Sequence, residues 1–229
     1  MTPTVLLFDI DGTLLDTGGT GRRALRRAFH ALHGRGDACD FPYDGMTDRR
    51  IARQGLEAAG LEATAERVDE VISAYLVQLG EEVRGAADGE YRVLPGMRGA
   101  VDAALCAPRT AVGLGTGNVR EGARLKLERV GLYASFRFGG FGCDHEDRPT
   151  LIRVGAERGA ALLGARLEEC RVVIIGDTPK DVAAAHALGA ECLGVATGSY
   201  DEAALRAAGA TFTFSGMDAD GALAALLGG

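Results

Sequence analysis

The stretch VLLFDIDGT at residues 5–13 opens with four apolar residues and continues into two aspartates, a glycine and a threonine. A short, uninterrupted apolar run is typical of a strand buried on both faces of a parallel sheet. In an open sheet of this kind, ligands bind beyond the carboxyl ends of the strands. The stretch therefore predicts both the fold class and the edge of the sheet at which a functional site lies.

Three further apolar runs have the same character, and segments with helical spacing separate them. The runs cover residues 110–114, 171–175 and 192–195 and end in glycine, aspartate or threonine. Between them, apolar residues recur at helical intervals, as at Met97, Val101 and Ala104. Strands that alternate with helices predict an α/β fold with a doubly wound, mostly parallel, Rossmann-like sheet.

Residues 18–90 break this alternation, because no strand pattern occurs there. Apolar residues fall on one helical face at 24–32 and again at 68–79. We predict an α/β catalytic core of residues 1–17 and 91–229, and an inserted all-helical cap of residues 18–90 that is left near residues 85–89. Four arginines on the first helix of this insert are interpreted as a solvated face in preference to a substrate-binding patch: Arg22, Arg23, Arg26 and Arg27.

Charge and composition disfavour several classes of function. The 229 residues carry 25 basic and 32 acidic side chains, and a net charge of −7 argues against a general binder of nucleic acid or anionic membranes. Only Lys126 and Lys180 are lysines, which we interpret as compositional bias. No apolar run approaches the roughly 20 residues that span a bilayer, and the five cysteines form no C-x-x-C pair. We expect a reduced cytoplasmic protein.

Acidic residues gather at the ends of two predicted strands. Asp9 and Asp11 follow the first strand, and Asp177 and Asp181 follow the strand at 171–175. A single aspartate would be interpreted as a helix cap or turn residue, but four at one sheet edge repel one another unless protons or a cation compensate them. A hard divalent cation with oxygen ligands, most simply Mg²⁺, is the expected compensation.

Asp9 and Asp11 are two residues apart, so an extended backbone puts both carboxylates on one side. One carboxylate can attack an electrophile, while the other donates a proton and later accepts one. Gly12 lets the chain turn sharply and brings its backbone N–H close to an anion. The pair therefore predicts covalent catalysis beside an anion site.

The predicted strand at 110–114 leads into a second candidate for anion binding. Thr116 and Gly117 precede a helical stretch, where backbone N–H groups and the helix dipole favour a phosphate oxygen. Asn118 suits either a ligand contact or the helix N-cap. The G-x-G-x-G spacing departs from the dinucleotide pattern G-x-G-x-x-G, and no P-loop motif occurs. Arg148 is the candidate cation for the remaining phosphate charge, with a solvated arginine as the alternative.

Together these motifs resemble the haloacid dehalogenase-like superfamily, and within it the phosphoglycolate phosphatase-type hydrolases. The resemblance is carried by D-x-D-G-T at 9–13, Thr116, Arg148-Pro149 and G-D-x-x-x-D at 176–181, and the helical insert matches the cap of that family. It implies that Asp9 is a nucleophile forming an aspartyl-phosphate and that Asp11 is the general acid/base. It also implies that Thr116 binds the transferring phosphoryl group.

The resemblance further implies a Mg²⁺ site made by Asp9, the backbone carbonyl of Asp11, and Asp177, with Asp181 as an adjacent or occasional direct ligand. One departure concerns the basic residue, because the family usually has lysine where Arg148 stands. Lys180 is the alternative for this role, and a lysine and an arginine are not interchangeable.

Selection of the substrate is assigned to the predicted cap, since a site that handles any phosphate needs a second surface to choose the leaving group and exclude water. The segment GMTDR at 45–49 is similar to one that many relatives carry, which makes Thr47, Asp48 and Arg49 the candidates.

The leading hypothesis is a Mg²⁺-dependent phosphatase acting on a small phosphorylated metabolite. The alternatives are a phosphoryl-transferring mutase similar to beta-phosphoglucomutase, a haloacid dehalogenase, and a catalytically silent binding protein on the same fold. The sequence leaves the identity of the substrate and the oligomeric state undetermined.

Overall fold

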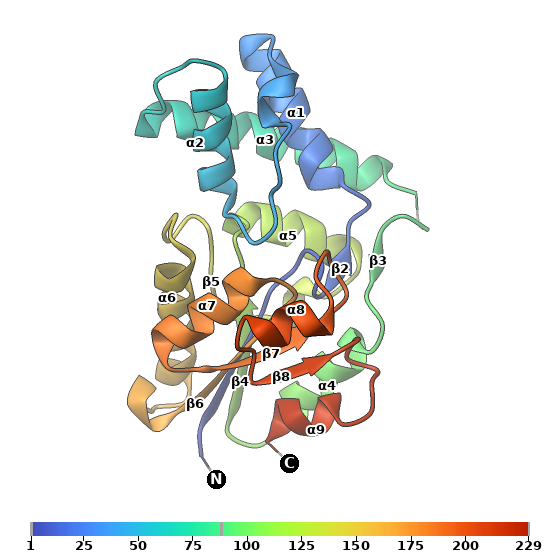
Figure 1. Ribbon diagram of the computed structural model, residues 1–229, viewed down its shortest axis with the longest axis vertical. Helices are drawn as coiled ribbons and strands as arrows, with labels where there is room; N and C mark the ends of the chain where they lie inside the picture. The colour runs from blue at the N-terminus through green and yellow to red at the C-terminus, as the bar shows by residue number, and fades with distance from the viewer. Residues whose placement is uncertain (1, 88, 229) are drawn as a thin grey trace.

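A six-stranded parallel sheet forms the centre of the protein in the computed structural model, which describes residues 2–87 and 89–228 (Figure 1). Its strand order is β5-β4-β1-β6-β7-β8, and every neighbouring pair is parallel. The strands are β1 (Thr4–Phe8), β4 (Thr110–Gly115), β5 (Gly139–Gly140), β6 (Arg171–Gly176), β7 (Glu191–Val195) and β8 (Phe212–Phe214). The predicted α/β fold with a mostly parallel sheet is confirmed.

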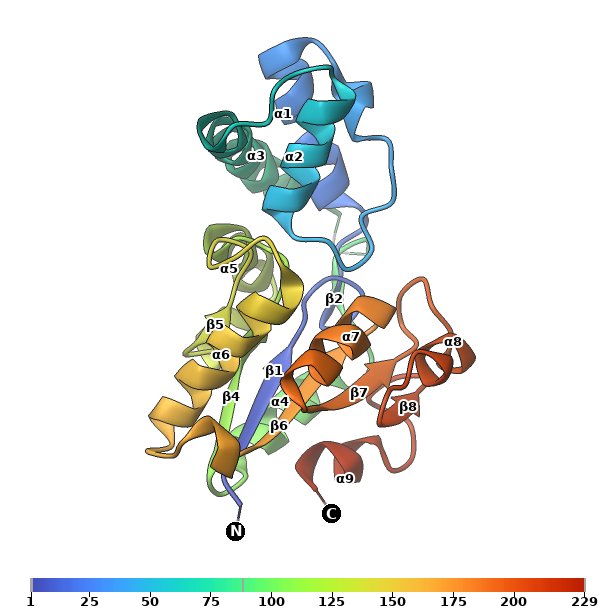
Figure 2. The ribbon, with the colours of Figure 1, turned by 60° about the vertical axis from the view of Figure 1, so that its left-hand side comes forward.

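Helices cover both faces of this sheet (Figure 2). In β1, Val5 and Leu7 pack with α6 (Arg148–Leu162) and α7 (Pro179–Leu188), whereas Leu6 and Phe8 belong to the core on the opposite face. That opposite core includes side chains of three other helices, α4 (Met97–Cys106), α5 (Arg120–Arg129) and α9 (Ala222–Leu227). A short helix, α8 (Glu202–Ala207), packs beside β7 and β8. Burial on both faces explains why the strands are continuous apolar runs rather than alternating ones.

The two edge strands, β5 and β8, were not predicted from the sequence. Strand β5 consists of Gly139 and Gly140 alone, so it has no apolar pattern to detect. Glycine is required there because a Cβ at Gly140 would collide with the backbone carbonyl of Leu151 in α6. The close approach of α6 to the sheet, and not a local preference for strand, therefore determines this element.

Helices α1 (Thr20–His33), α2 (Asp48–Ala58) and α3 (Ala65–Gly85) lie together beyond the carboxyl ends of the strands (Figure 1). They are connected to the rest of the chain by a small antiparallel sheet of β2 (Leu15–Asp16) and β3 (Arg92–Val93), which the sequence did not reveal. The described residues between 18 and 90 contain no strand, as expected, and α2 is an additional helix that was not predicted. The division into a core and a cap stays a prediction.

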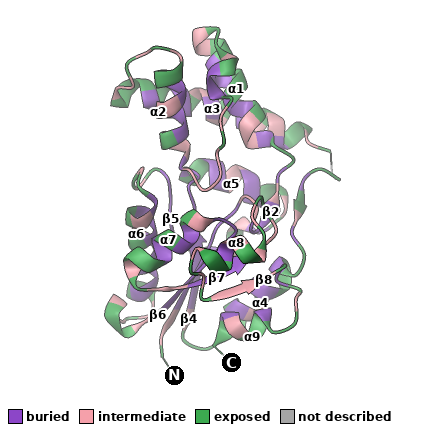
Figure 3. Ribbon diagram, in the orientation of Figure 1, coloured by how far each residue is buried: buried purple, intermediate pink, exposed green. Residues whose placement is uncertain are grey.

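Buried residues continue from the sheet into the helical layer above it (Figure 3). One core cluster joins Phe8 of β1 with Phe29 of α1 and Leu79 of α3. Gly18 and Gly19, at the predicted entry to the insert, have φ of 55° and 77°, which favours glycine. Residue 88, in the predicted exit segment, lies outside the described residues. No helix in the described part of the chain is long and apolar enough to cross a membrane.

Candidate active site

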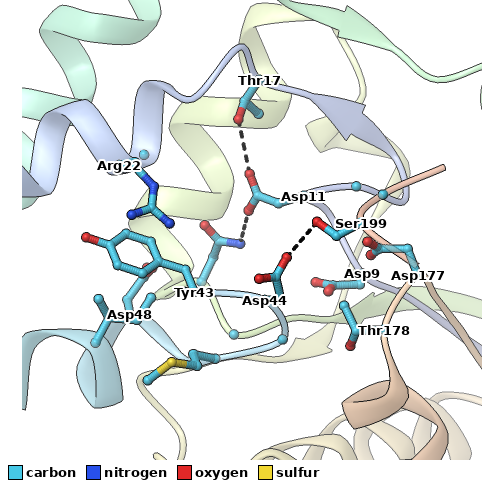
Figure 4. Close-up of a pocket in the computed structure, with 18 of the residues that line it drawn as sticks. Asp9, Asp11, Thr17, Arg22, Tyr43, Asp44, Asp48, Asp177, Thr178 and Ser199 are labelled. Carbon is cyan, nitrogen blue, oxygen red and sulfur yellow. Dashed lines mark hydrogen bonds between the residues drawn. The ribbon is translucent and has the colours of Figure 1, made fainter. Parts of the chain in front are cut away.

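A cavity of about 340 Å³ lies between helices α1–α3 and the carboxyl ends of the strands (Figure 4). The sheet side contributes the aspartates predicted from the sequence, and the helical layer contributes aromatic, charged and apolar side chains. The lining includes Asp9, Asp11, Gly12, Asn118, Lys126, Arg148 and Asp177 from the first side and Arg22, Leu25, Tyr43, Asp48, Ile51 and Tyr75 from the second. The structure therefore brings the D-x-D-G-T motif and the helical insert to one cavity.

Asp9 is buried at the end of β1, and two groups hold its carboxylate. The backbone N–H of Ile10 donates to Oδ1 at 2.8 Å, and Nη2 of Arg148 donates to Oδ2 at 2.7 Å. Arg148 also donates through Nε to Oδ1 of Asp181 at 3.0 Å. Arg148 is 6% exposed, so the alternative of a solvated arginine is wrong. Its planar fork bridges two carboxylates at once.

Asp9, Asp177 and Asp181 form a buried cluster whose carboxylate oxygens lie within 4.8 Å of one another. Asp177 accepts from the Thr13 hydroxyl at 3.0 Å through Oδ1. Asp181 also caps its own helix, because Oδ2 accepts from the backbone N–H and the hydroxyl of Thr178 at 3.0 and 2.7 Å. Oxygen ligands of this kind fit a hard cation such as Mg²⁺, and Asp9 and Asp177 are less occupied by protein donors than Asp181.

The electrostatics of this cluster also fit a cation. Burial, followed by the negative charges of Asp181 and Asp9, raises the pKa of Asp177 to about 8. Burial likewise raises the pKa of Asp9 despite the opposing charge of Arg148. One guanidinium therefore does not compensate three carboxylates, and a divalent cation would. Gly12, with φ of 78°, makes room for this arrangement, since a Cβ there would collide with the Asp177 carboxylate.

The Asp11 carboxylate lines the same cavity but is not part of this cluster, and other side chains hold it. Lys126 donates to Oδ1 and Oδ2 at 2.8 and 2.7 Å, Asn118 donates to Oδ2 at 2.8 Å, and the Thr17 hydroxyl donates to Oδ1 at 3.3 Å. Burial acts to raise the pKa of Asp11, but the charge of Lys126 and these hydrogen bonds hold the pKa below its usual value. A metal ligand from Asp11 would accordingly be its backbone carbonyl and not this side chain.

Thr116 and Asn118 lie between the two carboxylates. Thr116 is fully buried at the end of β4, and Asn118 Nδ2 donates to its hydroxyl at 2.9 Å. The alternative interpretation of Asn118 as a helix N-cap is wrong, because Val119 is the N-cap of α5 and the Asp48 carboxylate accepts the Val119 N–H at 2.8 Å. Gly117 passes so close to the α2 layer that a Cβ would collide with the carbonyl of Met46.

Of the three substrate-selecting candidates, Asp48 alone lines the cavity. Thr47 is buried and caps α2 by accepting the Arg50 N–H at 3.3 Å, and its hydroxyl donates to the Glu146 carbonyl at 3.0 Å. Arg49 pairs with Asp69. Burial raises the pKa of Asp48 to about 6, although the nearby charge of Lys126 opposes the rise. Thr47 and Arg49 therefore make contacts within the protein and do not line this cavity.

Sequence reasoning missed Lys126, Tyr75 and the special position of Arg22. Arg23, Arg26 and Arg27 form ion pairs on the surface, which agrees with the predicted solvated face. Arg22 instead lies 4.0 Å over the Tyr43 ring and lines the cavity. Tyr75 was interpreted only as part of an apolar helical face. The scarcity of lysine was an available signal for Lys126, but it was attributed to compositional bias.

Solved structures share this architecture. A hydrolase from Pseudomonas syringae is 20% identical with a TM-score of 0.68, covering 93% of this chain and 94% of that chain. CbbY from Rhodobacter sphaeroides in complex with phosphate is 17% identical with a TM-score of 0.69, covering 95% of each. A predicted phosphoglycolate phosphatase from Haemophilus somnus 129pt is 15% identical with a TM-score of 0.65, covering 94% of this chain and 95% of that chain. At these identities the likeness establishes the fold alone.

The family is established by the sequence itself. Residues 3–189 match the family of haloacid dehalogenase-like hydrolases, and the chain belongs to it. The resemblance carried by the D-x-D-G-T and G-D-x-x-x-D motifs is thereby confirmed. No curated protein matches the sequence.

Proposed function

We propose that this protein is a Mg²⁺-dependent phosphatase that hydrolyses a small phosphorylated metabolite through an aspartyl-phosphate on Asp9. The observation that carries the proposal is the contact of buried Asp9 with Arg148, beside a cluster of carboxylates that needs a cation. A nucleophile, a guanidinium and a divalent cation together supply the positioning and charge neutralisation on which phosphoryl transfer depends.

The proposed reaction has two displacements. An oxygen of the Asp9 carboxylate attacks phosphorus, the bond from phosphorus to the leaving oxygen breaks, and that oxygen takes a proton from the Asp11 carboxyl group, whose protonation the negative charge of the bound phosphate ester would favour. Water then attacks the same phosphorus, gives a proton to Asp11, and releases phosphate and the free Asp9 carboxylate. Thr116, Gly117 and Asn118, together with Gly12 and Arg148, are proposed to hold the phosphoryl oxygens. Mg²⁺, held by Asp9 and Asp177 with Asp181 beside them, would offset the phosphoryl charge.

Residues 18–90 are proposed to act as the cap that selects the leaving group. The Tyr75 hydroxyl lines the cavity and has no hydrogen-bond partner among the described residues, although the tyrosine is only 3% exposed. Gly21 of α1 lies near it, and a Cβ there would make an ordinary contact of 3.6 Å with the Tyr75 hydroxyl. The Asp48 carboxylate lines the same cavity. The cavity therefore offers a hydrogen-bond donor, the Tyr75 hydroxyl, and acceptors, the Asp48 oxygens. A leaving alcohol that carries hydroxyl groups fits such a lining.

The direct test is release of inorganic phosphate from a panel of phosphorylated metabolites, with Mg²⁺ and then with excess chelator. We expect hydrolysis of at least one compound and loss of activity on chelation. Full activity in chelator would refute the metal requirement and favour dehalogenase chemistry. An isomeric sugar phosphate in place of free phosphate would show a mutase, and no turnover of any compound would leave a binding protein.

The proposed contact between the cavity lining and the leaving alcohol is tested with two matched phosphomonoesters. One carries a hydroxyl on the leaving alcohol, and the other carries a methyl group in its place. Tyr75→Phe should lower kcat/KM roughly 10-fold for the first compound, as expected for loss of one hydrogen bond, and leave the second unchanged. An equal effect on both would contradict a contact between Tyr75 and the leaving group.

A further inference from the structure

Lys126 is a buried lysine whose three ammonium hydrogens are all engaged at the cavity wall. The residue belongs to α5 and is 3% exposed. Its Nζ lies 2.8 and 2.7 Å from the two carboxylate oxygens of Asp11 and 2.7 Å from Oδ1 of Asn118. The ammonium therefore fixes the plane of the Asp11 carboxylate through both oxygens, which a single contact would not do.

The choice of lysine at this position runs against the composition of the chain. Lysine accounts for two of 25 basic residues, and arginine fills every other basic position. Removing an ammonium from water is costly, so a buried lysine calls for a specific reason. The contacts supply one, because Nζ reaches both carboxylate oxygens of Asp11 and Oδ1 of Asn118 at 2.7 to 2.8 Å. A compact point charge fits between Asp11 and Asn118, where a guanidinium fork is larger.

The contacts of Lys126 link the two halves of the proposed site. Asn118, which accepts from Lys126, donates in turn to Asp11 at 2.8 Å and to the Thr116 hydroxyl at 2.9 Å. The same ammonium is therefore tied to the proposed proton carrier and, through one amide, to a proposed phosphate-binding hydroxyl. The Asp11 side chain is 42% exposed, and it lines the cavity.

We propose that Lys126 is a positioning residue of the reaction: with Asn118 it holds the Asp11 carboxylate at the leaving-group side of the cavity, away from the Asp9, Asp177 and Asp181 cluster. The inference rests on the proposed phosphatase function. Lys126 acts through Asp11 and is not itself the group that exchanges a proton with the substrate.

The test compares Lys126→Met with Arg124→Met, a matched change on the same helix. Arg124 is a surface residue paired with Glu121 and Glu128, so its loss should leave activity unchanged. With an alkyl phosphate substrate, Lys126→Met should lower kcat roughly 100-fold and change KM less than about 3-fold, since a misplaced proton carrier weakens the transition state and not substrate binding. Unchanged kcat, or equal losses in the two variants, would overturn the proposal.

A positioning role is separated from a general structural one by the leaving group and by a double-mutant cycle. An aryl group leaves readily without a proton, so Lys126→Met should lower kcat/KM, which reports the first displacement, much less for an aryl phosphate than for the alkyl phosphate. In an Asp11→Asn background, adding Lys126→Met should change the residual aryl phosphatase activity less than about 3-fold, because the group through which it acts is gone. Equal losses for both substrates, or full additivity, would show a structural role and refute the proposal.

Lys126→Arg covers the possibility that the methionine variant does not fold, because arginine keeps the buried positive charge. We expect it to remain folded, as judged by its thermal unfolding midpoint, and to stay at least 10-fold below wild type in kcat on the alkyl phosphate. Full activity of Lys126→Arg would overturn the proposal by showing that charge alone suffices. Absence of wild-type activity on every phosphomonoester would instead refute the underlying function.

Discussion

The two buried cations of the cavity, Arg148 and Lys126, face different aspartates in different ways. Arg148 contacts Asp9 through Nη2 and Asp181 through both Nη2 and Nε of one planar group, and all three side chains are almost fully buried. Lys126 contacts both oxygens of Asp11, whose side chain remains 42% exposed. A planar guanidinium thus joins two carboxylates on the side of the proposed nucleophile, and an ammonium orients one carboxylate on the side of the proposed leaving group.

The cluster of Asp9, Asp177 and Asp181 and the carboxylate of Asp11 therefore differ in how much positive charge they still require. Around the proposed nucleophile Asp9, burial and then the negative charges of Asp181 and Asp9 raise the pKa of Asp177 to about 8. On the leaving-group side, the charge of Lys126 and hydrogen bonds outweigh burial and lower the pKa of Asp11. One side is therefore left short of positive charge, which suits a metal, while the other is balanced by the protein itself.

The largest expected effect follows from replacing Asp9, the proposed nucleophile. Asp9→Asn should lower phosphate release by at least about 10⁴-fold, because the amide cannot form the acyl-phosphate. Mg²⁺-dependent release of phosphate is the measurement, with circular dichroism confirming the fold. Hydrolysis at the wild-type rate would remove Asp9 from the chemistry and with it the contrast between the two sides.

The fork itself is tested by Arg148→Lys, which keeps the charge and removes the bridge between Asp9 and Asp181. We expect kcat to fall by about 10- to 100-fold, since an ammonium presents no planar pair of donors. Arg158→Lys is the matched control on the same helix, because Arg158 also makes two-nitrogen contacts with a carboxylate, that of Asp144, away from the cavity. A wild-type kcat in Arg148→Lys would show that an ammonium beside Asp9 and Asp181 is sufficient and that the planar guanidinium is not needed there.

The smallest effect concerns Asp48, whose pKa of about 6 lies above its ordinary value of 3.8. Because the folded state binds the proton more tightly, the contribution of Asp48 to stability is full below about pH 4 and is lost as the pH rises through 6. Asp48→Asn should remove this pH-dependent loss in the free energy of unfolding, which is on the order of 1 kcal/mol for a partly buried group. Urea unfolding at pH 4.5 and at pH 7 measures the difference.

The matched control for this change is Asp44→Asn, which alters the charge of another residue on the same cavity, one that is hydrogen-bonded to Ser199. In a Lys126→Met background, the pH-dependent loss should extend above pH 6, because the charge that holds the Asp48 pKa down is gone. Identical pH profiles with and without Asp48 would contradict the assignment.

Much of the fold could be predicted from local pattern. The strands β1, β4, β6 and β7 are continuous apolar runs, and the residues after them carry the aspartates that meet at one edge. Strand β5 could not be predicted, because two glycines have no strand pattern and pair only where α6 packs closely. Helix α2 was overlooked although its pattern is helical, since its buried residues Ile51, Ala52, Gly55 and Leu56 recur at helical spacing.

The sequence by itself determined the family, the parallel sheet and the identity of Asp9, Asp11, Thr116, Arg148 and Asp177 as site candidates, because their spacing follows from strand ends that share one sheet edge. Only the tertiary structure decided which cation meets which carboxylate. Lys126 lies 115 residues from Asp11, and Arg148 lies 139 from Asp9. Pairing at such separations depends on how helices pack against the sheet, which no local spacing encodes.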